Sequence, residues 1–143
     1  MTNLFDKHYQ EASRFIRKLA MRIGTPGDTD HAIRVLKSVF ITLRRKLIPD
    51  DSLNIVSQLP LVVKGIYVDG WNINEPLLEA QTYDEFLYEL RHNTVRRADI
   101  DFGNDDLAKK KITAVFTSLK EYIPAGELNH IREELPKEVA EMV

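Results

Sequence analysis

The sequence predicts an all-α protein, a helical bundle made of two similar three-to-four-helix repeats packed as one domain. Apolar residues recur at intervals of three and four along most of the 143-residue chain, which is the spacing of one helix face. No stretch of four or more residues alternates between apolar and polar side chains in the setting of a strand. The chain also matches itself after a shift of 76 residues, which indicates an internal repeat.

The first repeat is predicted over about residues 3–68 and opens with a helix over 3–23. Residues 24–27 hold two glycines and a proline, so this segment forms a turn rather than an element. A second helix then continues until Pro49 ends it. We expect its first N–H groups to be capped by a short polar side chain, that of Asp28, Thr29 or Asp30.

Two shorter helices are predicted to complete the first repeat, one over about 51–59 and one from Pro60 to Tyr67. Proline suits the first turn of a helix because its missing N–H is not needed there. Residues 66–68 are the best candidate for a strand, and a weak one. Residues 69–81 are irregular, and we interpret them as the connection between the repeats.

The second repeat is predicted over about 82–143. Thr82 and Glu85 form a capping box, which opens its first helix. We expect a loop over 96–103 and a break at 125–126, with two short helical pieces after the break. Between the loop and the break lies a long helix, capped by Asn104 or Asp105.

The self-match places identical residues on the apolar faces of equivalent helices. The identical pairs are Val39/Val115, Phe40/Phe116, Leu43/Leu119, Ile55/Ile131, Leu59/Leu135, Pro60/Pro136 and Val63/Val139. Any two amphipathic helices can share apolar residues, but that does not explain a Leu-Pro pair at the same distance downstream. We therefore predict a duplication whose two halves pack on each other.

Composition restricts the classes of function and the location. The chain has no cysteine, which excludes disulfides, thiolate metal sites and cysteine nucleophiles and fits a reducing cytoplasm. A net charge of −2 does not favour general binding to nucleic acid or to anionic membranes. The longest apolar stretch, 59–63, is far shorter than the roughly 20 residues of a membrane span, and the first residues do not resemble a signal peptide. We expect a cytoplasmic protein.

The segment LIPDDS at 47–52, followed by QLPLVVKGIYVDGW at 58–71, is distinctive. It resembles the domain of unknown function 2267 family, which shows an lpx(D/E)(D/E)…QLPxxxrGxYyxGW stretch. The family's later features are also present, an eeF helix opening (DEF at 84–86) and a closing gE…LP segment (126–136). The family's aromatic pair before Gly-Trp is here Tyr67-Val68. The resemblance implies an all-helical, bacterial, cytoplasmic protein and carries over no catalytic residue.

No group of residues forms a recognisable active site, and no cofactor is predicted. None of the four histidines lies in a metal-binding pattern such as HExxH. His8 and Glu11 are three residues apart on one helix, a spacing more typical of a surface pair than of a metal site. His31 is expected to be exposed in the first turn of its helix. The acidic segment 99–106 lacks the EF-hand residues at positions five, six and twelve, so we interpret it as a polar loop.

Tyr67, Asp69 and Trp71 are the candidate binding residues. An aromatic pair beside a carboxylate can line a ligand pocket. The interpretation we favour is that Gly70 makes a turn with positive φ and that Trp71, the single tryptophan, packs between the repeats.

Basic clusters occur at 44–46, at Arg91 with 96–97, and at 109–111. Acidic residues lie near the second and third clusters, so we interpret these clusters mainly as solvated helix faces.

The function predicted from these observations is a non-enzymatic interaction or regulatory module that presents a groove or a helix face to a protein partner. One alternative is a small-molecule or metal-dependent enzyme with a pocket near Tyr67, Asp69 and Trp71. Another is a weak nucleic-acid binder that uses the arginine and lysine clusters. The sequence leaves the oligomeric state open.

Overall fold

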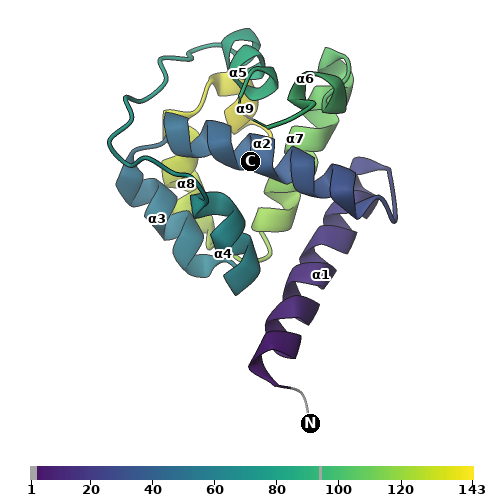
Figure 1. Ribbon diagram of the computed structural model, residues 1–143. Helices are drawn as coiled ribbons and strands as arrows, with labels where there is room; N and C mark the ends of the chain where they lie inside the picture. Colours follow the sequence, from purple (N-terminus) through teal and green to yellow (C-terminus); the bar gives the residue numbers. More distant parts are fainter. Residues whose placement is uncertain (1–2, 94) are drawn as a thin grey trace.

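The computed structural model describes residues 3–93 and 95–143, and this part of the chain contains nine helices and no strand (Figure 1). The all-helical prediction is confirmed. The helices are α1 (Leu4–Ile23), α2 (Thr29–Lys46), α3 (Pro49–Gln58), α4 (Leu61–Val68), α5 (Tyr83–Arg91), α6 (Ala98–Asp101), α7 (Asp105–Leu119), α8 (Ala125–Glu134) and α9 (Lys137–Ala140).

Short polar side chains begin the long helices, as predicted. The side chain of Asp28 accepts a hydrogen bond from the backbone N–H three residues further on, at 3.1 Å, and begins α2. Asn104 caps α7 in the same way at 2.9 Å. Gly24 ends α1 with φ of 96°, a left-handed conformation that a residue with a side chain rarely adopts. The predicted turn between the first two helices is therefore confirmed.

Three local predictions are wrong. Residues 96–103, predicted as a loop, contain α6, because Ala98, Asp101 and Phe102 are buried against the rest of the protein. Residues 125–126, predicted as a helix break, form the first turn of α8, since Pro124 precedes them in the extended conformation that favours a helix start. Residues 66–68, the weak strand candidate, lie in α4.

The core is one cluster drawn from both ends of the chain, and α2 runs through its middle (Figure 1). α2 packs against α1, α4, α5, α6 and α7. Its central residues Val35, Leu36, Val39, Phe40 and Leu43 have no exposed surface. Each such side chain contributes roughly 1.5–3 kcal/mol through burial. Both halves of the chain therefore contribute apolar side chains to one shared core.

The first turns of α1 extend beyond the core. The C-terminal half of α1 is buried against α2 and α7, and α1 also packs against α4, whereas the first turns of α1 extend away from the other helices (Figure 1). Leu4 is 65% exposed, Phe5 84% and Tyr9 72%. The consequence is a helix with an apolar stripe that the fold covers over only part of its length.

Candidate functional site

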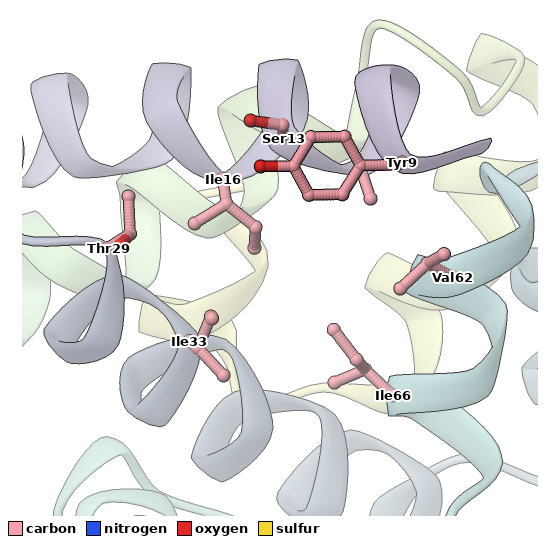
Figure 2. A pocket seen from close by; sticks show the side chains of 8 residues that line it. Tyr9, Ser13, Ile16, Thr29, Ile33, Val62 and Ile66 are labelled. Atoms are coloured by element: carbon pink, nitrogen blue, oxygen red, sulfur yellow. The ribbon is translucent and has the colours of Figure 1, made fainter. Parts of the chain in front are cut away.

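An apolar groove opens where α1, α2 and α4 diverge (Figure 2). Its volume is about 300 Å³. The groove is lined by Tyr9, Ala12, Ser13 and Ile16 of α1, Thr29 and Ile33 of α2, and Val62 and Ile66 of α4. We use the term apolar groove for these eight residues.

Helical spacing places these side chains on facing surfaces. Residues three and four apart share one face of a helix, so α1 presents four lining residues and the other two helices present one such pair each. Ala12 and Ser13 are small, which leaves open space between α1 and the β-branched residues opposite. Figure 2 shows Ile33, Val62 and Ile66 directed from α2 and α4 toward the space beneath α1.

The chemistry of the groove suits an apolar ligand. Its polar groups are three hydroxyls, those of Tyr9, Ser13 and Thr29, and its lining includes no carboxylate, imidazole or amine. The groove therefore offers apolar contact and a few hydrogen bonds, and its lining lacks a general base of ordinary pKa.

Tyr67, the first of the predicted site residues, is fully buried and lies outside the groove lining. Its hydroxyl lies 2.7 Å from the hydroxyl of Ser52, and its ring centroid lies 4.8 Å from that of Phe40. Burial raises the pKa of the Tyr67 phenol above its ordinary range, although the Ser52 hydrogen bond opposes this shift. Tyr67 thus packs within the core of the first helices.

Asp69 and Trp71 lie at the end of α4, also outside the groove lining. Asp69 is exposed, and its backbone carbonyl accepts a hydrogen bond of 2.7 Å from Arg44. The half-buried Trp71 ring meets Tyr67 edge-on, with 6.1 Å between the ring centroids. Gly70 has a φ of 69°, as predicted for this turn. The aromatic pair is therefore close together, while a ligand pocket at these residues stays a prediction.

His31, which we expected to be exposed, is buried, with 9% of its surface accessible. Its Nδ1 lies 3.2 Å from Oδ1 of the buried Asp101. Arg34 donates two hydrogen bonds to the same carboxylate, at 2.8 and 3.1 Å, and the Lys111 ammonium donates to the backbone carbonyl of Asp101. These contacts join α2, α6 and α7. The interpretation of 99–106 as a purely polar loop is wrong at Asp101.

Burial alone would raise the pKa of Asp101, but the hydrogen bonds and charge of Arg34, together with His31, hold this pKa below its ordinary value. The carboxylate is therefore a structural anion. Within residues 3–93 and 95–143, no three histidine, cysteine, aspartate or glutamate residues lie together in a way that could hold a metal ion. His8 and Glu11 form a surface pair at 3.7 Å.

Several residues of the basic clusters bind within the protein rather than facing solvent alone. Arg44 donates to the carbonyl of Tyr67 at 2.9 Å, and Arg45 pairs with Glu75 at 3.2 Å. Arg91 donates to Asp105 at 3.1 Å. These three arginines are therefore partly buried and paired within the protein, whereas Arg96, Arg97, Lys109 and Lys110 are exposed.

The sequence profile of a family described as an uncharacterized conserved protein (DUF2267) matches residues 12–142. The chain belongs to this family. The DUF2267 match includes α2 to α9 completely but begins within α1, so Phe5 and Tyr9 precede the matched segment. Among curated proteins, none matches this sequence. Of the helices in the described part of this DUF2267 chain, none has both the length and the apolar character that a membrane crossing requires.

A carboxylate that the sequence did not single out connects α8 with α3 in this DUF2267 chain. Glu134, at the end of α8, accepts a hydrogen bond of 2.8 Å from the backbone N–H of Ile48, just before α3. Burial, and then a hydrogen bond with the nearby Asp51, raise the pKa of Glu134 from 4.5 to about 7. Burial beside Asp51 therefore favours the protonated form of Glu134 at this helix start.

Replacing Glu134 with glutamine should stabilise the protein at pH 8 by about 1–2 kcal/mol, after allowance for partial solvent exposure. A raised folded-state pKa means that the stabilising proton is fully present below pH 4.5 and is lost as the pH rises through about 7. The glutamine side chain should still accept the hydrogen bond from the Ile48 backbone N–H, and its amide N–H can donate to Asp51 at every pH. Urea unfolding at pH 5 and pH 8 measures the effect.

The matched control is Glu133→Gln, which removes a neighbouring exposed carboxylate from the same helix. It should leave stability within about 0.5 kcal/mol at both pH values. A Glu134→Gln variant that is less stable than the natural protein at pH 8 would show that the ionised carboxylate is favourable there, which contradicts the raised pKa.

Proposed function

We propose that this chain is a cytoplasmic, non-enzymatic interaction module that holds an amphipathic helix of a protein partner in its apolar groove. The observation that carries the proposal is the open groove of about 300 Å³, with a lining of mainly apolar side chains. A helix that docks in a groove presents apolar residues at positions i, i+3 or i+4, and i+7. The groove offers matching walls on three helices.

The dimensions of the groove support such a ligand. Its wall on α1 runs from Tyr9 to Ile16, which is about 10 Å or two helical turns. Two or three anchor side chains of a docked helix fit along this length. Each anchor contributes roughly 1.5–3 kcal/mol when it is fully buried. The summed binding free energy of two or three such anchors is typical of a reversible interaction.

We also propose that residues 3–68 and 82–143 are two repeats, joined by 69–81 and packed as one domain. In support, the starts of α2 and α7, of α3 and α8, and of α4 and α9 are each separated by 76 residues. A side-chain bond recurs at the same offset, since Thr42 donates to the carbonyl of Ser38 at 2.9 Å and Ser118 to that of Ala114 at 3.0 Å.

The repeat explains why the groove belongs to one half only. The first helix of the first repeat, α1, has 20 residues, whereas α5 has nine. The additional turns of α1 include the exposed residues Leu4, Phe5 and Tyr9. The second repeat has no such turns, which supports the proposal that the turns in α1 serve binding.

The Val62→Asp variant should lose binding to helical peptides by at least about tenfold, because a charge placed in the apolar groove is desolvated by the ligand. The probe is a displayed library of amphipathic helical peptides about 18 residues long. Val62 is 43% exposed, so the substitution leaves the core intact. Selected peptides are measured by fluorescence anisotropy.

The control is Leu53→Asp, at a residue of α3 that is 48% exposed and lies outside the groove. It should bind the selected peptides as tightly as the natural protein does. If the library yields no peptide whose binding depends on Val62, the proposal is wrong.

The enzyme alternative requires a ligand at Tyr67, Asp69 and Trp71. The bond between the buried Tyr67 hydroxyl and Ser52 weighs against it, because a substrate would have to displace that bond. The nucleic-acid alternative requires free arginines, and the bonds of Arg44 and Arg45 within the protein weigh against it.

A further inference from the structure

We infer that the helix that fills the apolar groove is the N-terminal half of α1 from a second copy of this chain. The two copies would form a symmetric dimer in which their α1 helices run antiparallel. The inference depends on the proposed function, since it names the partner of the same groove.

α1 is itself a helix of the kind that the groove accepts. Phe5, Tyr9, Ala12 and Ile16 lie on one face of α1, because they are separated by three or four residues. The two aromatic side chains are 84% and 72% exposed. Within one copy, Tyr9, Ala12 and Ile16 line the groove, whereas Phe5 lies beyond the groove and is exposed to solvent. A twofold axis allows each copy to supply both the helix and the groove.

A single copy leaves a large amount of apolar surface on α1 and α4 uncovered. An aromatic side chain has roughly 150–250 Å² of surface, so Phe5 and Tyr9 together expose about 300 Å² in each copy. Leu4, Leu61 and Val62 add to this surface, with 65%, 53% and 43% of their area exposed. Counted over two copies, the total approaches the roughly 1,200 Å² at which stable interfaces begin. Contact through these residues is therefore large enough for a dimer.

The charges beside the apolar face of α1 are complementary in an antiparallel pair. Asp6 and Arg17 are both exposed and lie 11 residues apart, which is close to three helical turns, so they lie on the same flank of the apolar face. In an antiparallel pair, the same flanks of the two helices face each other. Asp6 of each copy would then meet Arg17 of the other, once at each end of the contact. In a parallel pair opposite flanks face each other, so Asp6 and Arg17 would not meet.

This pairing also fixes the register. When Asp6 lies opposite Arg17 of the second copy, the twofold axis passes close to Gln10 and Ser13 on the same flank. Tyr9 of one copy then lies level with position 14 of the other, between Ser13 and Ile16 of the α1 wall of the groove, and Phe5 lies level with position 18. The charge pairs and the apolar contacts therefore agree on one arrangement.

Light scattering during gel filtration, at about 100 μM, should give the mass of a dimer for the natural protein. Phe5→Asp should give a monomer, because two carboxylates would be buried in the contact. Ile100→Asp, at an exposed apolar residue of α6, should remain a dimer. Asp6→Arg should weaken the dimer about tenfold, and combining it with Arg17→Asp should restore it, since the charges then pair in reverse.

Crosslinking tests the register. The chain has no cysteine, so Gln10→Cys introduces a single thiol near the proposed axis. A short bismaleimide should join two copies of this variant. Lys109→Cys, in α7, should give no crosslinked dimer under the same conditions.

A natural protein that is monomeric at this concentration would overturn the inference, and so would a Phe5→Asp variant that remains a dimer or charge reversals that fail to restore it. The proposed function is tested separately with Phe5→Asp, because Phe5 is not part of the groove lining. A monomeric variant that still binds the selected peptides separates the two. Loss of peptide binding to a folded, monomeric protein would count against the groove itself.

Discussion

Replacing Asp101 with asparagine should lower the free energy of unfolding at pH 7 by about 2–3 kcal/mol. The carboxylate is 4% exposed and accepts two hydrogen bonds from Arg34, with His31 also in contact. An amide of the same size presents one acceptor oxygen and no charge, so it cannot match both donors of the guanidinium. Because Arg34 itself is partly exposed, the cost falls below that of stranding a fully buried cation. Urea unfolding followed by circular dichroism measures the loss.

Asp99→Asn is the matched control, because Asp99 is exposed and lies in the same short helix. It should change stability by less than about 0.5 kcal/mol. The depressed pKa of Asp101 also predicts the pH dependence. Its stabilisation is present above the ordinary carboxyl pKa of about 3.9 and is lost as the pH falls through the lower folded-state value. The natural protein and the Asp101→Asn variant should therefore converge in stability in acid, and equal stability at pH 7 would contradict the assignment.

The helix starts were predictable because their causes are local. Asp28 and Asn104 begin α2 and α7 through hydrogen bonds to residues three positions away, which the sequence displays directly. Gly24 ends α1 for an equally local reason. By contrast, α6 depends on the burial of Ala98 and Phe102 against distant helices, and no pattern within 96–103 reveals this.

The buried polar groups were not predictable for the same reason. His31 occupies a first turn, where a side chain is usually exposed, and only the proximity of Asp101, 70 residues later, explains its burial. The link between Glu134 and Ile48 spans 86 residues. Such contacts depend on how helices cross, which apolar periodicity does not specify.

The apolar groove could have been anticipated in part. The apolar stripe of α1 continues to Phe5 and Tyr9, beyond the length that a neighbouring helix covers, and this continuation is visible in the sequence. Val62 and Ile66 lie four apart, which places them on one face of α4. That these faces meet Ile33 of α2 is a property of the packing. The unusual composition of residues 67–71 instead favoured Tyr67, Asp69 and Trp71 as site residues. These residues lie outside the groove, and Tyr67 is buried.

Tyr67→Ala should have the largest effect of any substitution considered, a loss of about 3–5 kcal/mol in the free energy of unfolding. Tyr67 is among the largest fully buried side chains, and its ring contacts Phe40 and Trp71. Truncation removes this contact area and leaves a cavity in the packed core. The measurement is thermal or urea unfolding, with Trp71 emission as a second signal that reports local exposure.

Tyr67→Phe separates the contribution of the ring from that of the hydroxyl. It should cost about 1–2 kcal/mol, because the buried Ser52 hydroxyl loses its partner at 2.7 Å while the ring packing is kept. Tyr88→Ala, at a tyrosine that is 60% exposed, serves as the surface control and should cost less than about 1 kcal/mol. If Tyr67→Ala were as stable as this control, Tyr67 would not be a packing residue, and a ligand site beside Asp69 and Trp71 would become the better explanation for its place in the sequence. A large loss for Ala with a small loss for Phe would instead mean that the ring holds α4 against α2, and so maintains the α2 and α4 walls of the apolar groove.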